Sequence, residues 1–314
     1  MKAVYFDSFG ANDVLKFGDV ERPIPKQDEV LIKLTHTSVN PVDYKIRAGH
    51  LQGMMPHVFP IIPGWDASGT VVENSGAFKK GDRVFAYART GTVKYGTYAE
   101  YTTLPVSSVA KAPASISAAE AAAVPLVALT AWQALFDFAD LKSGETVFIP
   151  GGSGGVGSFA IQFAKIKGAR VITTTSGRNM DYVKSLGADI VIDYTTQDVV
   201  QALRASVPEG IDVVLDCVGG DTQDQAWRVI KNEGRFVSIV DSPSAALAIE
   251  KNVKAGFWFV NPDAPRLNLI SELIDAKKLQ LPAISVRSIN DAAAALAEVE
   301  SRRVRGKIVL TLDF

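Results

Sequence analysis

The chain has 314 residues, of which 47% are hydrophobic and 21% are charged, and its formal net charge at pH 7 is −1. This composition is typical of a globular protein, and the length exceeds that of most single domains, so we expect two domains. A net charge this close to zero argues against the basic proteins that bind nucleic acids or acidic membrane surfaces, and we predict no partner of either kind.

The start of the chain and its cysteine content bear on the compartment. Residues Met1–Asp7 enter a strand pattern at once, so no signal peptide is expected. The one cysteine, Cys217, excludes an internal disulfide and fits a reducing compartment. The most apolar stretch, Ala121–Phe136, is too short to span a membrane and indicates a helix instead. We therefore predict a cytoplasmic protein without a membrane segment.

The first 122 residues predict an irregular β domain. Short β segments alternate there with glycine and proline, which is typical of a partly open barrel. An alanine-rich stretch, Ala118–Ala123, marks the boundary of this domain. The expected strands are Glu29–Leu34, Ala67–Val72, Asp82–Ala86 and Thr97–Tyr101.

A glycine-rich turn separates a buried strand from a helix pattern within Val147–Lys165, and its glycines have the spacing G-x-G-x-x-G. In that motif the first glycine permits a tight turn and the second lets the backbone approach a pyrophosphate. The third lets the helix pack close to the strand. Free amides and the positive end of the helix dipole then face the anion. The predicted phosphate-binding residues are Gly152, Ser153, Gly154, Gly155, Val156 and Gly157.

The residues after this turn alternate between strand and helix patterns as far as Val260. These strands are apolar throughout, which indicates a parallel sheet covered on both faces. The pattern predicts a doubly wound, Rossmann-type α/β fold. The expected strands are Arg170–Thr175, Ile190–Ile192, Val213–Leu215, Phe236–Val240 and Phe257–Val260, and the helices are Asn179–Leu186, Asp198–Ala205 and Gln225–Ile230.

The last segment is expected to return to the first domain. We therefore predict one domain formed by residues 1–122 with 263–314 and a dinucleotide-binding domain at 123–262. Ligands are expected between the two, at the carboxyl ends of the parallel strands. The predicted elements of the return are helices at Leu267–Leu279 and Ala292–Arg302 and strands at Ala283–Val286 and Lys307–Leu312.

The end of the second parallel strand indicates which dinucleotide is bound. An NAD site usually has Asp or Glu about 20 residues past the glycines. Here no carboxylate occurs before Asp181, whereas Ser176 and Arg178 offer a hydroxyl and a guanidinium that suit a phosphate monoester. Tyr194 is expected to pack on the adenine or to reach the same phosphate. These residues favour NADP(H) over NAD, the alternative being that Arg178 is a solvated residue of a helix's first turn.

The order of these features resembles the medium-chain dehydrogenase/reductase superfamily over nearly the whole chain. The resemblance is closer to its zinc-independent branch of quinone oxidoreductases and enone (alkenal) reductases. It implies a GroES-like catalytic domain joined to a Rossmann domain, and a homodimer is common among such enzymes. The resembling segments, besides the glycine turn, are Ser38–Lys45, Pro63–Gly69, Gly81–Val84, Gly96–Tyr101, Leu129–Trp132 and Val304–Val309.

The resemblance also implies contacts to the cofactor outside the glycine turn. One segment passes the ribose after the fourth parallel strand, and two segments flank the nicotinamide after the fifth and sixth strands. The C-terminal return closes over the cofactor, and a threonine positions the nicotinamide or the substrate carbonyl. These predicted contacts are Thr130, Cys217, Val218, Ile239, Phe257, Phe259 and Lys307.

No metal site is predicted. Zinc-dependent members of the superfamily use cysteine and histidine ligands, and a structural zinc often uses four cysteines, whereas this chain has one. Asn40, Trp65 and Leu126 stand where the resemblance would place the catalytic cysteine, histidine and second cysteine. Trp and Leu side chains do not ligate metals. The three remaining histidines, His36, His50 and His57, are scattered and form no tetrahedral motif.

Without a metal, the expected chemistry is hydride transfer to a substrate that absorbs the negative charge itself, such as an enone, an alkenal or a quinone. The enzyme then needs a cation or donor near the substrate oxygen. Lys45, just past the turn at Asn40, is the first candidate, and Asn40 and Tyr44 are the further predicted catalytic residues. Leu51 stands where some relatives carry a tyrosine, which argues against an enoyl-thioester reductase that uses a tyrosine proton donor.

Two functions of different class follow from these residues. The first is an NADPH-dependent reductase of small electrophiles, either conjugated carbonyl compounds or quinones. The second is an NADPH-binding protein with a structural or regulatory task and little turnover. The residues leave the physiological substrate open, because a few loop side chains determine it.

Overall fold

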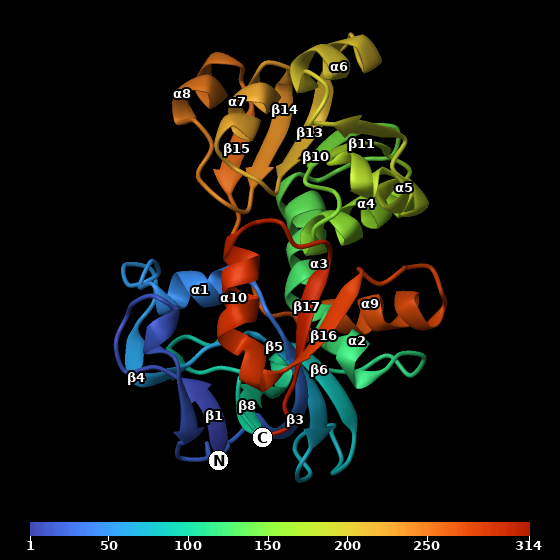
Figure 1. Cartoon of the computed structure of the whole chain (residues 1–314). Coiled ribbons are helices and arrows are strands. Elements are labelled where there is room, and N and C mark those ends of the chain that lie inside the picture. The colour runs from blue at the N-terminus through green and yellow to red at the C-terminus, as the bar shows by residue number, and fades with distance from the viewer. The chain divides into compact units, whose positions relative to one another are not determined.

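The computed structural model describes all 314 residues, and the chain divides into two compact units. The first unit comprises Met1–Leu126 together with Asn261–Phe314, and the second comprises Val127–Val260. Figure 1 shows the C-terminal strands of the first unit beside strands from the beginning of the chain. None of the helices combines the length and the apolar character that a bilayer crossing requires.

The second unit is built on a six-stranded sheet in which every pairing is parallel. Its strand order is β12-β11-β10-β13-β14-β15, and the central strand β10 is buried at every position. The predicted doubly wound parallel sheet is therefore confirmed. The strands are β10 Thr146–Pro150, β11 Arg170–Thr175, β12 Ile190–Asp193, β13 Ile211–Asp216, β14 Ile230–Ser238 and β15 Lys254–Phe257.

Helices connect these strands and pack on them (Figure 1). Helix α4 runs from the glycine turn to Gly168, whose φ of 86° is the left-handed conformation that commonly ends helices at glycine. The helix predicted at Gln225–Ile230 instead covers Asp221–Trp227, and it ends before Ile230 because Ile230 pairs with Ile211 in the sheet. The helices are α3 Pro125–Trp132, α4 Gly155–Lys167, α5 Met180–Ser185, α6 Val199–Ser206, α7 Asp221–Trp227 and α8 Ala245–Glu250, with a π-helical segment at Gln133–Phe138 and a 3-10 turn at Gly177–Asn179.

The first unit contains a seven-stranded, mostly antiparallel sheet of order β16-β17-β3-β5-β6-β9, in which β8 also pairs with β3. The C-terminal strand β17 pairs with β3, with Val309 opposite Ser38. Two further sheets of two strands each pair β1 with β2 and β4 with β7. The strands of the whole unit are β1 Lys2–Tyr5, β2 Lys16–Asp19, β3 Glu29–Ser38, β4 His57–Ile62, β5 Asp66–Val71, β6 Arg83–Tyr87, β7 Val93–Tyr95, β8 Tyr101–Pro105, β9 Val109–Lys111, β16 Ile284–Ser288 and β17 Lys307–Thr311.

The strand predicted at Thr97–Tyr101 is wrong for its first four residues. The backbone N–H groups of Thr97 and Tyr98 donate to the carbonyls of Gly64 and Pro63, outside any ladder. A side chain at Gly96 would overlap three backbone carbonyls, so this segment is held against another loop rather than in a sheet.

Short helices surround this sheet. Asn40 precedes the first of them, Pro41 occupies its first position, and the Asp43 carboxylate accepts the N–H of Asn40, as in a capping box. The helices are α1 Pro41–Arg47, α2 Ala118–Ala122, α9 Ala264–Asp275 and α10 Ala292–Glu300, with 3-10 turns at Asn12–Val14, Val106–Ser108 and Ile289–Asp291.

The buried carboxylate of Asp216 organises the loop that follows β13. One oxygen accepts the N–H groups of Val218 and Gly219, both at 2.9 Å. The other accepts the Gln223 amide at 2.9 Å and the Ser238 hydroxyl at 2.8 Å. Loop, helix α7 and strand β14 therefore share one acceptor.

We expect Asp216→Ala to lower the free energy of unfolding by about 3 kcal/mol, because four donors lose their acceptor in a buried site. Urea unfolding followed by circular dichroism measures this change. Asp224→Ala, at an exposed position of α7, is the control and should shift it by no more than about 1 kcal/mol. Equal effects of the two substitutions would contradict the organising role of Asp216.

Candidate cofactor and active site

The glycine turn between β10 and α4 has the shape of a phosphate cradle. A Cβ at Gly152 would overlap the Thr173 hydroxyl, and a Cβ at Gly157 would overlap the Gly151 carbonyl and lie 2.7 Å from the Gly152 Cα. These two positions therefore admit only glycine. Gly154, the N-cap of α4, differs, because its nearest neighbour would lie 3.4 Å away, at the Gly151 oxygen. The fold itself leaves room for a side chain at Gly154, so its glycine fits the close approach of a ligand.

Ser153, Ser176 and Arg178 lie around the ends of β10 and β11. The Ser153 hydroxyl accepts from the Thr175 hydroxyl at 3.1 Å and from the Asn179 amide at 3.3 Å. The same amide lies 3.5 Å from the Ser176 hydroxyl, so Asn179 connects the two predicted serines. Arg178, in the turn before α5, is exposed. These polar groups suit the adenosine end of a dinucleotide phosphate.

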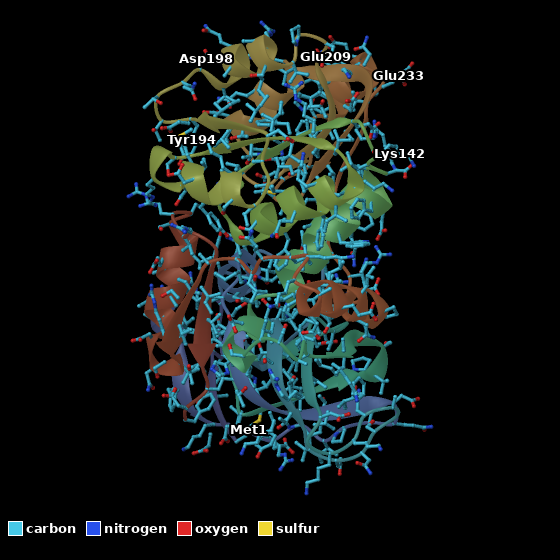
Figure 2. All side chains as sticks on the ribbon, turned by 90° about the vertical axis from the view of Figure 1, so that its right-hand side faces the viewer. Met1, Lys142, Tyr194, Asp198, Glu209 and Glu233 are labelled. Carbon is cyan, nitrogen blue, oxygen red and sulfur yellow. The ribbon has the colours of Figure 1, made fainter.

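Asp193 is the last residue of β12, and Tyr194 follows it at the same sheet edge. Tyr194 is 58% exposed and projects from the surface in Figure 2. A Cβ at Gly177 would come 2.8 Å from an Asp193 oxygen, so a carboxylate lies beside the turn that carries Arg178. Hydrogen bonds from Thr195 lower the pKa of Asp193, which keeps it ionised. The residues after the second strand do not reveal Asp193, because it belongs to the third strand.

The predicted nicotinamide and ribose contacts lie at the carboxyl ends of neighbouring parallel strands. Cys217 and Val218 follow β13, Ile239 follows β14, and Phe257 ends β15, with Ser238 opposite Phe257 in the sheet. Phe257 stacks on Phe259 with ring centroids 6.3 Å apart. Burial raises the pKa of the Cys217 thiol, and Asp216 adds to the effect, so this thiol is no nucleophile at neutral pH.

Asn40 lies at the centre of a set of buried polar contacts in the first unit. Its backbone N–H donates to Asp43 Oδ2 at 2.8 Å, and its amide Nδ2 donates to Asp66 Oδ2 at 2.7 Å. Its Oδ1 accepts from the Lys307 ammonium. All four residues are at most 4% exposed. Protein groups therefore hold both ends of the amide that we predicted as catalytic.

Lys307, which was predicted to contact the cofactor, is 4% exposed. Its ammonium lies inside the first unit, 3.0 Å from the Val39 carbonyl and 3.4 Å from Asp66 Oδ2. Burial lowers the pKa of Lys307, while Asp66 and Asp43 oppose that change. Neither aspartate is among the site residues predicted from the sequence, although Asp43 lies within the resembling segment Ser38–Lys45 and Asp66 within Pro63–Gly69.

The other predicted site residues differ in exposure. Lys45 is partly buried on α1. Tyr44 is 8% exposed and packs in a hydrophobic cluster with Val39 and Leu310, so its ring stabilises the unit. Thr130, on α3, is 4% exposed.

The three positions where zinc ligands would stand serve other purposes. Trp65 packs edge-on against the Tyr87 ring at a centroid distance of 5.9 Å. The backbone N–H of Leu126 donates to Asp66 Oδ1 at 2.8 Å, and the amide of Asn40 is bonded as described. No group of three His, Cys, Asp or Glu side chains in the chain could hold a metal ion.

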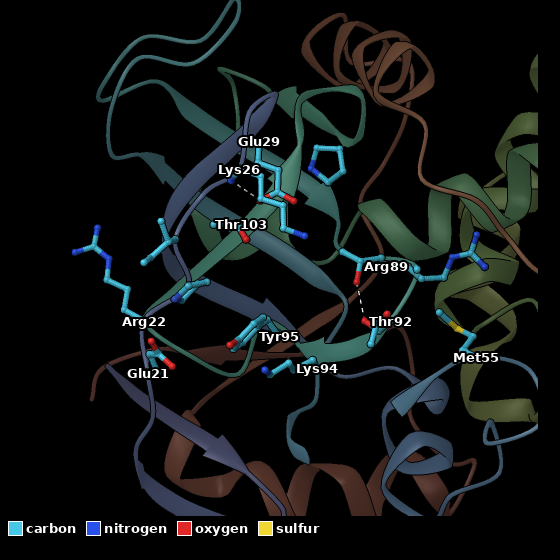
Figure 3. A pocket seen from close by; sticks show the side chains of 15 residues that line it. Glu21, Arg22, Lys26, Glu29, Met55, Arg89, Thr92, Lys94, Tyr95 and Thr103 are labelled. Atoms are coloured by element: carbon cyan, nitrogen blue, oxygen red, sulfur yellow. Dashed lines mark hydrogen bonds between the residues drawn. The ribbon is translucent and has the colours of Figure 1, made fainter. Parts of the chain in front are cut away.

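A surface pocket of about 1000 Å³ lies wholly in the first unit and contains none of the predicted site residues (Figure 3). The glycine turn and the sheet edge belong to the second unit, so this pocket is not their phosphate cradle. Its charged lining residues are Glu21, Arg22, Lys26, Glu29, Arg89 and Lys94.

Comparison with known proteins agrees with this arrangement. The family model described as an alcohol dehydrogenase GroES-like domain matches residues 26–114, and the one described as a zinc-binding dehydrogenase matches residues 186–310. A chloroplastic quinone-oxidoreductase homolog of Spinacia oleracea is 34% identical over 99% of this chain and 98% of its own length. A chloroplastic NADPH-dependent alkenal/one oxidoreductase of Arabidopsis thaliana is 33% identical over 99% of this chain and 79% of its own.

Among solved structures, the quinone oxidoreductase of Coxiella burnetii superimposes with a TM-score of 0.88 at 34% identity, covering 99% of each chain. The first unit is thus a GroES-like domain and the second a Rossmann domain, as predicted, and together they define an NAD(P)H-dependent oxidoreductase. The chain belongs to the medium-chain dehydrogenase/reductase superfamily, in the branch of quinone oxidoreductases and alkenal/one reductases. The predicted cofactor, NADP(H), is confirmed, because the relatives include NAD(P)H and NADPH oxidoreductases and a similar solved structure, of a mycobacterial protein, is a complex with NADPH.

We expect Gly157→Ala to weaken NADPH binding at least tenfold and to lower the melting temperature, because the new methyl group overlaps the Gly151 carbonyl and pushes α4 from the turn. Fluorescence titration with NADPH and thermal unfolding measure the two effects. Gly53→Ala is the control, since a Cβ there meets nothing within 4 Å. Unchanged NADPH affinity in Gly157→Ala would be incompatible with the cradle.

Proposed function

We propose that the protein is an NADPH-dependent, zinc-independent reductase that transfers hydride to a quinone or to the conjugated double bond of an α,β-unsaturated carbonyl compound. The glycine turn at Gly152–Gly157, in which Gly152 and Gly157 admit no side chain and Gly154 leaves its space open to a ligand, is the observation that carries the proposal. The relatives' names support both substrate classes and NADPH.

The chain's own residues define what the reaction requires of the protein. NADPH supplies the hydride when it is bound. Hydride addition leaves negative charge on the carbonyl or quinone oxygen of the substrate, and a cation fixed near that oxygen lowers the barrier. Lys45 is the proposed cation, because it is a partly buried ammonium on α1, and that helix begins at the rigidly held Asn40.

The small-molecule electrophile is the substrate that we propose, and we propose no other partner for the reaction. A homodimer is our proposal for the assembly, on the resemblance alone, and sedimentation velocity tests it. The single, partly buried cysteine is compatible with a reducing compartment such as the cytoplasm, which we keep as the proposed location.

We expect Lys45→Met to lower kcat by about 100-fold with enones and quinones, since one fixed charge at an oxyanion contributes about that factor. NADPH affinity should stay unchanged. Lys33→Met, an exposed lysine of β3, is the matched control and should keep full activity. Steady-state NADPH oxidation with a panel of enones, alkenals and quinones gives the measurement.

The panel also separates the two substrate classes and tests the proposal as a whole. Consumption of conjugated carbonyls, with the carbonyl retained in the product, indicates an enone reductase, and turnover of quinones alone indicates a quinone oxidoreductase. Tight NADPH binding without turnover of any electrophile would overturn the proposal and favour a structural or regulatory protein.

We expect Arg178→Ala to weaken NADPH binding about tenfold while NADH binding stays the same, because a guanidinium binds the extra phosphate through charge-assisted hydrogen bonds. Titration calorimetry with each nucleotide measures the ratio. Arg204→Ala on α6 is the control for lost positive charge. An equal loss for both nucleotides would show that Arg178 does not read the 2′-phosphate.

A further inference from the structure

Three charged groups lie together in the interior of the first unit, and Asn40 touches all of them. We call Asp43, Asp66 and Lys307 the buried charge cluster. Asp43 and Asp66 are 0% exposed and Lys307 is 4% exposed. The Lys307 ammonium lies 3.4 Å from Asp66 Oδ2 and bonds the Asn40 side chain as well. The cluster joins helix α1, strand β5 and strand β17.

The charges of this cluster do not balance if every group is ionised. Two carboxylates and one ammonium leave an excess negative charge with no access to solvent, and an unpaired buried charge is strongly unfavourable. One retained proton makes the cluster neutral. The remaining question is which carboxylate holds the proton.

The hydrogen-bond donors around the two carboxylates answer it. Asp66 accepts from the Ser38 hydroxyl at 2.6 Å, the Asn40 amide at 2.7 Å and the Leu126 N–H at 2.8 Å, besides its contact with Lys307. These donors stabilise the ionised form of Asp66.

Asp43 is poorer in donors. Only its Oδ2 is bonded, to the Asn40 N–H at 2.8 Å and to the Tyr98 hydroxyl at 3.2 Å, and its buried Oδ1 has no partner. The unpartnered Oδ1 is the atom on which a proton is least unfavourable, because an ionised oxygen there would lack any donor.

The surrounding titratable groups agree with this placement. Burial raises the pKa of Asp43 to about 7; the Asn40 N–H, Lys307 and Tyr98 oppose the change, and Asp66 adds to it. Burial raises the pKa of the Tyr98 phenol too, and also that of the nearby Tyr87 phenol, so both stay neutral. Arg47, on the same helix as Asp43, pairs with Glu300 at 3.3 Å instead.

We propose that Asp43 retains a proton up to neutral pH and acts as a positioning residue, keeping Lys307 on the Asn40 amide at the start of the helix that carries Lys45. When Asp43 ionises, the ammonium is shared between two carboxylates, Asn40 loses its donor, and an excess negative charge lies near the proposed oxyanion site. The second part of this inference rests on the proposed function, and the first part does not.

Infrared difference spectroscopy of the wild-type protein tests the retained proton directly. Asp43 should give the carbonyl band of a protonated carboxylic acid at pH 6, and the band should disappear as the pH rises through about 7. The band should be absent from Asp43→Asn, an isosteric variant that keeps an oxygen for the Asn40 N–H. A wild-type protein without this band at pH 6, or a variant that retains it, would overturn the proposal.

Stability provides a second measurement that needs no turnover. A raised carboxyl pKa means that the folded state favours the protonated form, so this contribution is complete below the unfolded pKa and is lost as the pH rises to about 7. The melting temperature of the wild type should therefore fall, relative to that of Asp43→Asn, between pH 5 and pH 8. Parallel pH profiles would contradict a titrating Asp43.

The activity profile tests the positioning role. We expect kcat of the wild type to decline above pH 7 by about tenfold per pH unit, the slope for loss of one proton, and Asp43→Asn to lack this decline. His50→Gln, at an exposed histidine, should keep it. An Asp43→Asn variant whose kcat declines like that of the wild type would overturn the positioning role. Absence of any turnover, with the infrared and melting results intact, would instead reject the proposed function.

Discussion

The first unit, which contains Asn40 and Lys45, depends on the pairing of β17 with β3. It places Val309 opposite Ser38 and so brings Lys307 to Asn40, 267 positions earlier in the chain. Without this ladder the first unit would lack an inner strand of its sheet, and two buried aspartates would lack their one cation. The same pairing fixes the beginning of α1, because Lys307 on β17 donates to Asn40, the N-cap of that helix. Asn40 also bonds Asp43 and Asp66.

Most of the second unit could be predicted, because its strands and its glycine turn follow from local sequence patterns. Apolar runs bounded by turns indicate parallel strands, and the spacing of Gly152, Gly154 and Gly157 is a local signal whose geometric reason the structure supplies. Element ends were less accurate. The predicted helix at Gln225–Ile230 is wrong at its end because Ile230 pairs in the sheet, and pairing depends on a strand elsewhere in the chain.

The features that the sequence did not reveal are non-local. Asp193 reaches the Arg178 turn only because β12 lies beside β11, and Thr97 leaves the predicted strand because its N–H bonds Gly64. In the sequence, Asp43 and Asp66 look like ordinary helix-cap or surface residues. Only the structure shows that both are buried and which hydrogen-bond donors each carboxylate has. The sequence shows where the carboxylates are, but only the packing determines which of them are buried away from water and which remain protonated.

The discontinuity of the first unit has a consequence for how the protein is made. A ribosome releases residues 1–126 and then the whole Rossmann unit before the strand that completes the GroES-like sheet. Until β17 has been synthesised, the Ser38 end of β3 lacks its partner strand, and Asp43 and Asp66 lack the Lys307 ammonium. The order of synthesis thus places the completion of the GroES-like sheet after that of the Rossmann unit.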